Sequence, residues 1–188
     1  MTLSLEGKKG LVVGIANESS IAYGCAKALK AAGAELAVTY LNEKSRKYVE
    51  PLAEALDARL FLPMNVESQQ ELDQVFEAIE EQWGEIDFVV HSIAWSPLDE
   101  LHGRVVDSTS EGFARAMDIS CHSLIRMAKR AEPLMKNGGS IITMSYYGSE
   151  KVVDHYNMMG PIKSALESSV RYLAAELGEK NIRVNSVS

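Results

Sequence analysis

The sequence predicts a doubly wound α/β fold, in which helices cover both faces of a parallel sheet. Short apolar runs rich in Val, Ile and Leu alternate with longer segments of helical period along the chain of 188 residues. Uninterrupted apolar runs are typical of strands buried on both faces, and helices between such strands make them parallel. We therefore expect a single domain around one six-stranded sheet.

Each predicted strand is a short apolar run, and each predicted helix has apolar residues three and four positions apart. We expect strands at 9–15, 34–40, 59–66, 86–93, 139–146 and 182–188. We expect the helices between them at 20–33, 43–58, 69–83, about 110–135 and about 156–177. Ligands of such sheets bind beyond the carboxyl ends of the strands where the strand order reverses, which here falls between the first and fourth strands.

Composition and charge exclude several classes of protein. The net charge of −7 is spread along the chain without a Lys/Arg-rich run, which argues against nucleic acid and anionic membranes as partners. Cys25 and Cys121 lie within helical patterns and indicate buried free thiols. No leader pattern and no apolar stretch of about 18 residues occurs, so we expect a cytoplasmic protein that neither is exported nor spans a membrane. We expect no metal site.

The loop after the first strand, GIANESSIAYG, contains the parts of a phosphate-binding turn but not the G-x-G-x-x-G pattern. Gly14 permits a tight turn, Ser20 can cap the following helix, and the N–H groups at the helix start suit a pyrophosphate. An ordinary connection between strand and helix explains the loop equally well.

The ends of the next three strands carry further candidate residues. Leu41 stands at the second tip, where a dinucleotide site often has an acidic residue, and Lys44 and Arg46 follow, so the residues alone do not decide between NADH and NADPH. Asn65 can bind an adenine or simply form a turn. At the fourth tip, small Ser92 and Ala94 would let a nicotinamide ribose approach the backbone.

His91, on the same fourth strand, is more typical of a core histidine than of a catalyst.

Tyr156 and Lys163 lie seven positions apart, close to two helical turns. If a helix begins near Tyr156, both side chains project from one face, and Pro161 falls in the first turn, where it costs little. A nearby ammonium would stabilise the phenolate and lower the pKa of the tyrosine. Such a pair is common by chance, so its meaning depends on the rest of the chain.

Five segments together resemble a known family: GIANESSIAYG, HSIAWSP, SYYGSEKVV, YNMMGPIK and IRVNSVS. They are similar to the bacterial NADH-dependent enoyl-acyl-carrier-protein reductases of type II fatty acid synthesis, a divergent branch of the short-chain dehydrogenase/reductase superfamily. Commoner members of the superfamily carry Tyr-x3-Lys, but here Gly160 stands at that position and the lysine follows at the longer spacing of the enoyl reductases.

The resemblance implies reduction of the trans-2 double bond of an enoyl thioester by hydride from NADH, with NADPH as the alternative cofactor. Tyr156 would donate a hydrogen bond to the thioester carbonyl, Lys163 would hold the nicotinamide ribose, and Tyr146 would line the same pocket. Gly160 would leave room for close approach. The implied cofactor-binding positions are Gly14, Ser20, Ile21, Leu41, Asn65, Val66, Ser92, Ile93, Ala94 and Lys163.

The resemblance also implies acyl carrier protein as the substrate-bearing partner and a homotetramer as the assembly. The family continues beyond the sixth strand with a helical lid, a last strand and a helix, so we expect residues 1–188 to be a single Rossmann domain truncated before those parts. Two alternatives remain: another short-chain dehydrogenase/reductase acting on an alcohol or ketone, and a nucleotide-binding protein without catalysis.

Overall fold

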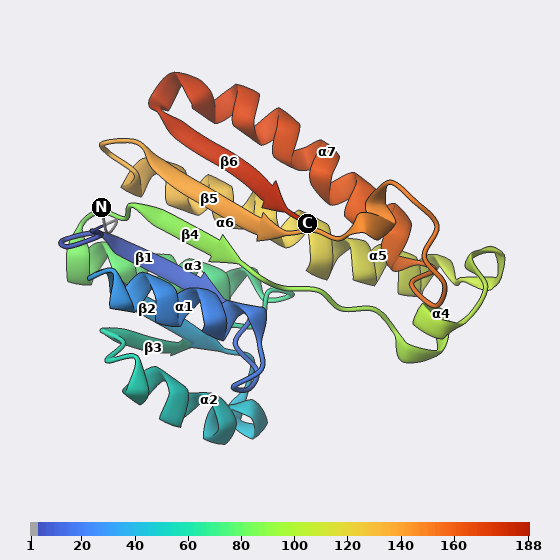
Figure 1. Cartoon of the computed structure of the whole chain (residues 1–188), viewed down its shortest axis with the longest axis horizontal. Helices are drawn as coiled ribbons and strands as arrows, with labels where there is room; N and C mark the ends of the chain where they lie inside the picture. Colours follow the sequence, from blue (N-terminus) through green and yellow to red (C-terminus); the bar gives the residue numbers. More distant parts are fainter. Residues whose placement is uncertain (1–3) are drawn as a thin grey trace.

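A parallel sheet of six strands forms the centre of the molecule, with helices on both faces (Figure 1). The computed structural model describes residues 4–188. The strands are β1 Lys9–Val13, β2 Glu35–Tyr40, β3 Leu60–Pro63, β4 Phe88–His91, β5 Gly139–Met144 and β6 Ile182–Val187. Their order in the sheet is β3-β2-β1-β4-β5-β6, and every neighbouring pair is parallel. The predicted strands and their direction are confirmed, and β6 lies at one edge.

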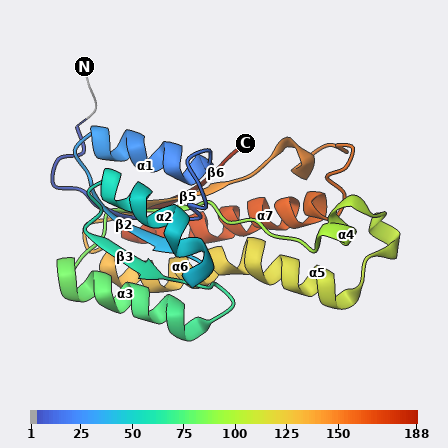
Figure 2. The ribbon, with the colours of Figure 1, turned by 90° about the horizontal axis from the view of Figure 1, so that it is seen from below.

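Helices cover both faces of the sheet, and α4 lies beyond the carboxyl ends of the strands (Figure 2). They are α1 Ile21–Ala31, α2 Glu43–Ala55, α3 Gln69–Trp83, α4 Leu98–His102, α5 Ser110–Met117, α6 Ser123–Ala131 and α7 Met159–Leu177. Alternate residues of a strand point to opposite faces, so Val12 packs with α1 and α2, whereas Leu11 and Val13 pack with α3, α6 and α7. None of the described helices is long and apolar enough to cross a membrane.

The strand order reverses between β1 and β4, as predicted. From β1 the chain moves outward through β2 and β3, then crosses back to β4 and continues outward through β5 and β6 on the other side. The connections at the carboxyl ends of β1 and β4 therefore diverge and leave space between them. This edge of the sheet is where the candidate site lies.

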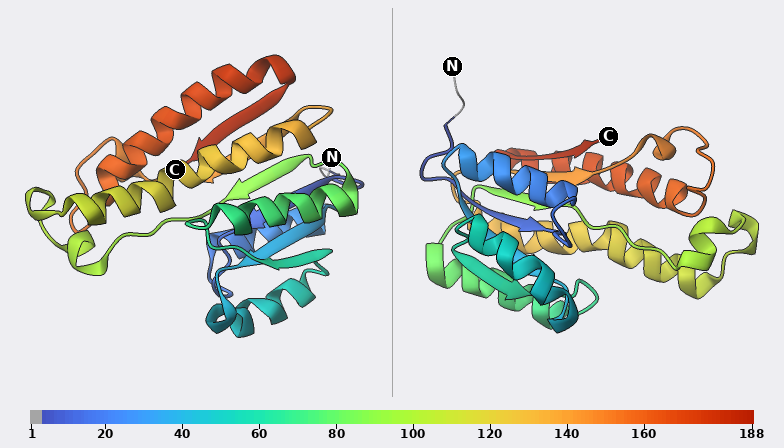
Figure 3. Two further views of the ribbon diagram at one scale, coloured as in Figure 1. Left: turned by 180° about the vertical axis from the view of Figure 1, so that it is seen from behind. Right: turned by 60° about the horizontal axis from the view of Figure 1, so that its bottom comes forward.

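The helix expected at about 110–135 is interrupted. Between α5 and α6 the chain forms a π-helical segment, Asp118–His122, and a 3-10 turn at Glu132–Leu134 follows α6. Ser123, the first residue of α6, donates from its hydroxyl to the Ile119 carbonyl of this segment at 2.6 Å, which competes with the regular helical hydrogen bonds. Figure 3 shows α5 and α6 continuing one after the other beside α7.

The last long helix begins at Met159, so the expectation that Tyr156 starts it is wrong. His155 and Asn157 have φ values of 64° and 34°, and this left-handed backbone cannot belong to a right-handed helix. Tyr156 therefore lies in a turn before α7, and it does not share a helical face with Lys163. Pro161 still falls in the first turn, as expected.

The described cysteines are free thiols. Cys121 is buried, as expected, whereas Cys25 is only partly buried.

Candidate functional site

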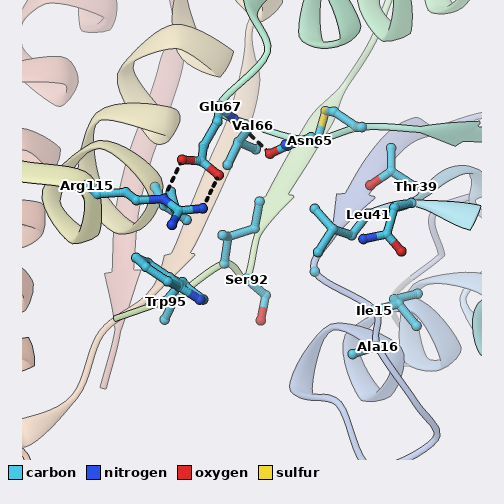
Figure 4. A pocket seen from close by; sticks show the side chains of 16 residues that line it. Ile15, Ala16, Thr39, Leu41, Asn65, Val66, Glu67, Ser92, Trp95 and Arg115 are labelled. Carbon is cyan, nitrogen blue, oxygen red and sulfur yellow. Dashed lines mark hydrogen bonds and ion pairs between the residues drawn. The ribbon is translucent and has the colours of Figure 1, made fainter. Parts of the chain in front are cut away.

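A cavity of about 420 Å³ opens at the carboxyl ends of β1, β2, β3 and β4 (Figure 4). Its volume lies in the range of small-molecule sites. Most of the predicted cofactor positions line it: Gly14, Leu41, Asn65, Val66, Ser92, Ile93 and Ala94. The rule that places ligands where the strand order reverses therefore located this cavity from the sequence.

Gly14 brings the ends of β1 and β4 together. Its φ of 101° lies in the region that favours glycine, and a Cβ at this position would lie 2.0 Å from the backbone oxygen of Ser92. No side chain fits between these two segments. The turn after β1 thus depends on a glycine, as predicted.

Ser20 acts differently from the expectation. It occupies the N-cap position of α1, but its side chain makes no capping hydrogen bond. Instead its Oγ accepts hydrogen bonds from the N–H groups of Ala16 and Asn17, both at 3.0 Å, and so holds the preceding loop in shape. Neither Ser20 nor Ile21 lines the cavity, and the Ile21 side chain faces solvent.

The tip of β2 offers the cavity an uncharged surface. Leu41 and Asn42 line it, and the Asn42 side chain accepts a hydrogen bond from the Ser45 N–H at 3.0 Å, which caps α2. Arg46, the nearby cation, donates to Glu50 at 2.9 Å. Its charge is therefore already paired within α2.

Asn65 at the tip of β3 both forms a turn and lines the cavity. It lines the cavity, and its Oδ1 also accepts a hydrogen bond from the Glu67 N–H at 3.0 Å, which closes a turn. Its own N–H donates to Glu71 Oε2 at 2.7 Å. The segment from Asn65 to Glu67 is thus an ordered turn, called here the β3 turn.

His91 at the end of β4 is a core histidine, as predicted. It is completely buried, and its ring nitrogens lie 2.8 Å from Thr143 Oγ1 and 2.8 Å from Ser123 Oγ. Burial, with a smaller contribution from the Lys163 charge, lowers its pKa to about 3. The ring is therefore neutral at pH 7 and joins β4 to β5 and α6.

Three further residues of the cavity have no signal in the sequence: Glu67, Trp95 and Arg115. Arg115 Nε donates to Glu67 Oε1 at 2.7 Å, and its guanidinium lies 4.4 Å from the centre of the Trp95 ring. Residues 67 and 115 are 48 positions apart, so no local pattern relates them.

A cluster of aromatic residues lies beyond the end of β5. The rings of Tyr146 and Tyr156 are 4.7 Å apart, centre to centre, and tilted by 60°. A Cβ on Gly148 would lie 2.4 Å from the Tyr156 ring, and one on Gly160 would lie 3.0 Å from the Gly148 oxygen. Gly160 does permit close approach, but what approaches it here is the backbone of Gly148.

The segment that carries Tyr146 is tied to α7. Glu167 accepts hydrogen bonds from the hydroxyls of Ser145 and Ser149, the latter at 2.6 Å. The Ser164 hydroxyl donates to the Ser149 carbonyl at 2.5 Å. These contacts fix the position of Tyr146 beside Tyr156.

Lys163 is buried, and its ammonium donates to the Met144 carbonyl at 2.6 Å. Burial lowers the pKa of Lys163 and raises that of Tyr156 to about 12, with Tyr146 as a second cause. Lys163 is not among the causes of the Tyr156 shift. The expectation that it lowers the pKa of the tyrosine is therefore wrong in this structure, because burial dominates.

The structure keeps the aromatic cluster and the strand-end cavity apart. Tyr146, Tyr156 and Lys163 do not line the cavity at the strand ends, and Tyr156 lines a separate cavity of about 390 Å³. Both cavities lie at the carboxyl edge of the sheet. The protonated phenol of Tyr156 and the buried ammonium of Lys163 thus lie at the same edge of the sheet as the strand-end cavity.

Comparisons with known proteins agree on one family. The family model described as "Enoyl-(Acyl carrier protein) reductase" matches residues 14–188. Enoyl-[acyl-carrier-protein] reductase [NADH] 1 of Rhizobium meliloti is 53% identical over 184 residues, which cover 98% of this chain and 68% of the relative. The corresponding NADH enzyme FabI of a Nostoc species is 48% identical, covering 99% of this chain and 73% of the relative.

Solved structures show the same relationship. The reductase of Anaplasma phagocytophilum, crystallised in complex with NAD, superposes with a TM-score of 0.97 at 52% identity, covering all of this chain and 72% of that one. The NADH enzyme of Aquifex aeolicus superposes with a TM-score of 0.95 at 46% identity, over 98% of this chain and 73% of that one.

Proposed function

This chain belongs to the enoyl-[acyl-carrier-protein] reductase family, and we propose that Tyr156, Lys163 and Tyr146 are the residues that carry out its reaction. The chain is an NADH-dependent oxidoreductase of fatty acid biosynthesis that reduces the double bond of an enoyl thioester. The observation that best supports the proposed roles is the half-buried, protonated phenol of Tyr156 beside Tyr146, at the edge where the cavity opens.

The cavity at the strand ends fits NADH. The close contact of Gly14 with Ser92 removes side-chain bulk where a dinucleotide crosses between β1 and β4. We propose that Asn65 and Val66 hold the adenine and that Ser92, Ile93 and Ala94 hold the nicotinamide ribose. Ser20 and Ile21 lie outside the cavity, so their part is limited to the start of α1, whose N-terminus suits the pyrophosphate.

The tip of β2 suits NADH better than NADPH. A 2′-phosphate needs a free cation near this tip. Leu41 supplies none, and Arg46 is already paired with Glu50, which leaves Lys44 in the first turn of α2 as the remaining nearby cation.

Tyr156 acts as a hydrogen-bond donor to the thioester carbonyl. NADH, when bound, supplies the hydride that adds to the β-carbon of the substrate. Negative charge then collects on the carbonyl oxygen, and a donor already in place stabilises this charge most in the transition state. The raised pKa of about 12 keeps the proton on Tyr156 at neutral pH, so the donor is always present.

Lys163 and Tyr146 support this donor. An ammonium has three N–H donors, and Met144 takes one of them, which leaves two for the hydroxyls of the nicotinamide ribose. Burial of Lys163 excludes water from these contacts. Tyr146 packs against the Tyr156 ring and limits its rotation.

The substrate is carried on acyl carrier protein, as the names of the relatives imply. We propose a homotetramer as the working assembly, residues 1–188 as one dinucleotide-binding domain, and the cytoplasm as the location. The family resemblance supports the assembly, the single sheet supports the one domain, and the free thiols fit a reducing compartment. Size-exclusion chromatography with light scattering tests the tetramer.

The experiment that tests the proposed function is the oxidation of NADH, followed by absorbance, when a trans-2-enoyl thioester on acyl carrier protein is added. Turnover in wild type that is lost in Tyr156→Phe supports the proposal. NADPH in place of NADH should give slower turnover. Undiminished turnover in Tyr156→Phe would contradict the role of the tyrosine, and turnover of a ketone but not of the enoyl thioester would indicate a different reductase.

A further inference from the structure

Glu67, Trp95 and Arg115 form one wall of the strand-end cavity and are called here the Arg115 cluster (Figure 4). Arg115 Nε donates to Glu67 Oε1 at 2.7 Å and its second nitrogen donates to Oε2 at 3.0 Å, so the pair is bidentate. The other contact of the guanidinium is the Trp95 ring, at 4.4 Å. Figure 4 shows Arg115 between the other two side chains, opposite Leu41 and Ile15.

The Arg115 cluster connects α5 to the ends of two strands. Glu67 belongs to the β3 turn, where its N–H closes the hydrogen bond to Asn65. The backbone of Trp95 has its own anchor, because its N–H and its carbonyl both bond to the buried Ser120 hydroxyl, at 2.7 Å and 2.9 Å. Arg115 therefore links the β3 turn, through Glu67, to the anchored residue Trp95 after the end of β4.

A second arginine holds the same turn. Arg126 donates to the Val66 carbonyl at 2.6 Å and to Asp118 at 2.5 Å. The turn is thus held by its backbone at Val66 and by a side chain at Glu67. The contact through Glu67 is the one that reaches the cavity wall.

The Arg115–Glu67 pair orients the two side chains more than it stabilises the fold. Its side chains are 52% and 33% exposed, and such pairs add little to folding stability. A bidentate contact nevertheless fixes the relative orientation of its partners. The hydrogen bonds from Arg115 also lower the pKa of Glu67, so its carboxylate is charged and accepts both hydrogen bonds of the guanidinium.

We propose that Arg115 is a positioning residue for the adenosine half of NADH, because it fixes the β3 turn against which the adenine binds. The inference rests on the proposed function and deepens it. Arg115 acts through Glu67 and does not itself bind the pyrophosphate.

Two substitutions and three ligands test this inference. We would prepare Arg115→Met and Glu67→Gln, singly and together, in the full chain. Dissociation constants would be measured for NADH, for 5′-AMP as the adenosine half, and for reduced nicotinamide mononucleotide as the other half. Each single variant should bind NADH and 5′-AMP about fivefold more weakly. The mononucleotide should bind unchanged, and the double variant should be no weaker than either single one.

A matched control uses an ion pair of similar length far from the cavity. Lys180 and Glu132 are 2.7 Å apart next to the amino ends of β6 and β5, so Lys180→Met should leave all three dissociation constants unchanged.

Several results would overturn the inference. Tighter NADH binding in Glu67→Gln with weaker binding in Arg115→Met would show that the freed guanidinium binds the cofactor directly. Unchanged affinities, or equal weakening for the mononucleotide, would also overturn it. If wild type itself bound no NADH, the proposed function would fail. If wild type bound NADH and the variants bound it with the same affinity, this inference alone would fail.

Discussion

The strand-end cavity and the aromatic cluster beyond β5 are built in different ways. The cavity depends on backbone turns and small residues, such as Gly14 against Ser92. The aromatic cluster depends on functional side chains held by other side chains, as Glu167 holds the segment of Tyr146. A substitution in the cavity should therefore disturb fold and binding together, whereas one in the cluster can remove chemistry alone.

The largest effect is expected at Tyr156. Phenylalanine keeps the ring contact with Tyr146 but removes the donor, so kcat should fall by about 10²- to 10³-fold. NADH affinity and the unfolding midpoint should stay the same. Steady-state kinetics and an NADH titration check both statements. A loss of NADH affinity as large as the loss of turnover would contradict the separation of the two regions.

Gly14→Ala is the counterpart in the cavity. The new methyl group would meet the Ser92 oxygen, and the backbone φ is positive, so the free energy of unfolding should fall by about 2 kcal/mol. NADH binding should weaken as well. Urea unfolding and a titration measure the two effects.

Gly24→Ala is the matched control. Gly24 lies inside α1, and a Cβ there meets nothing within 4 Å, so alanine should stabilise the protein by about 0.5–1 kcal/mol. Equal destabilisation by both substitutions would refute the explanation.

Lys163→Met should affect both regions. It removes a buried charge that donates to Met144 and, in our proposal, to the nicotinamide ribose, so NADH should bind about tenfold more weakly. The same variant should also lower kcat. Isothermal titration would measure the NADH dissociation constants of this variant and of Tyr156→Phe. Equal constants in the two variants would show that Lys163 does not belong to the cofactor site.

The last effect appears only at acidic pH and concerns His91, which joins β4 to β5 and α6. Its folded pKa of about 3 lies below its ordinary value of 6.5. Between these two pH values the imidazole is protonated in the unfolded chain but neutral in the folded chain. The stability from this residue is present above pH 6.5 and is lost as the pH falls toward 3, by at most about 1.4 kcal/mol per pH unit. Urea unfolding at several pH values and the NMR signals of the ring check this, and protonation of the folded ring near pH 6 would contradict it.

The sequence predicted the parts of the molecule that follow from local patterns. Buried apolar runs identified the strands, their alternation with helices identified the parallel sheet, and the reversal of strand order located the cavity. The same reasoning recognised His91 as a core residue.

The parts that it missed depend on contacts between distant segments. Helix α7 begins later than predicted because His155 and Asn157 adopt a left-handed backbone, which their residue types do not require. Ser20 has a residue type that often caps helices, yet its hydroxyl accepts hydrogen bonds from the loop before the helix. Proximity of Tyr156 to Lys163 in sequence suggested a lowered pKa, but burial depends on the whole fold.

The π-helical segment constrains the number of residues between α5 and α6. Asp118–His122 separates Arg115, which reaches Glu67, from Arg126, which reaches Val66. Deleting one residue would rotate α6 by about 100° relative to α5, so the two arginines could no longer reach the same turn. Insertions and deletions in this stretch should therefore be tolerated less well than substitutions.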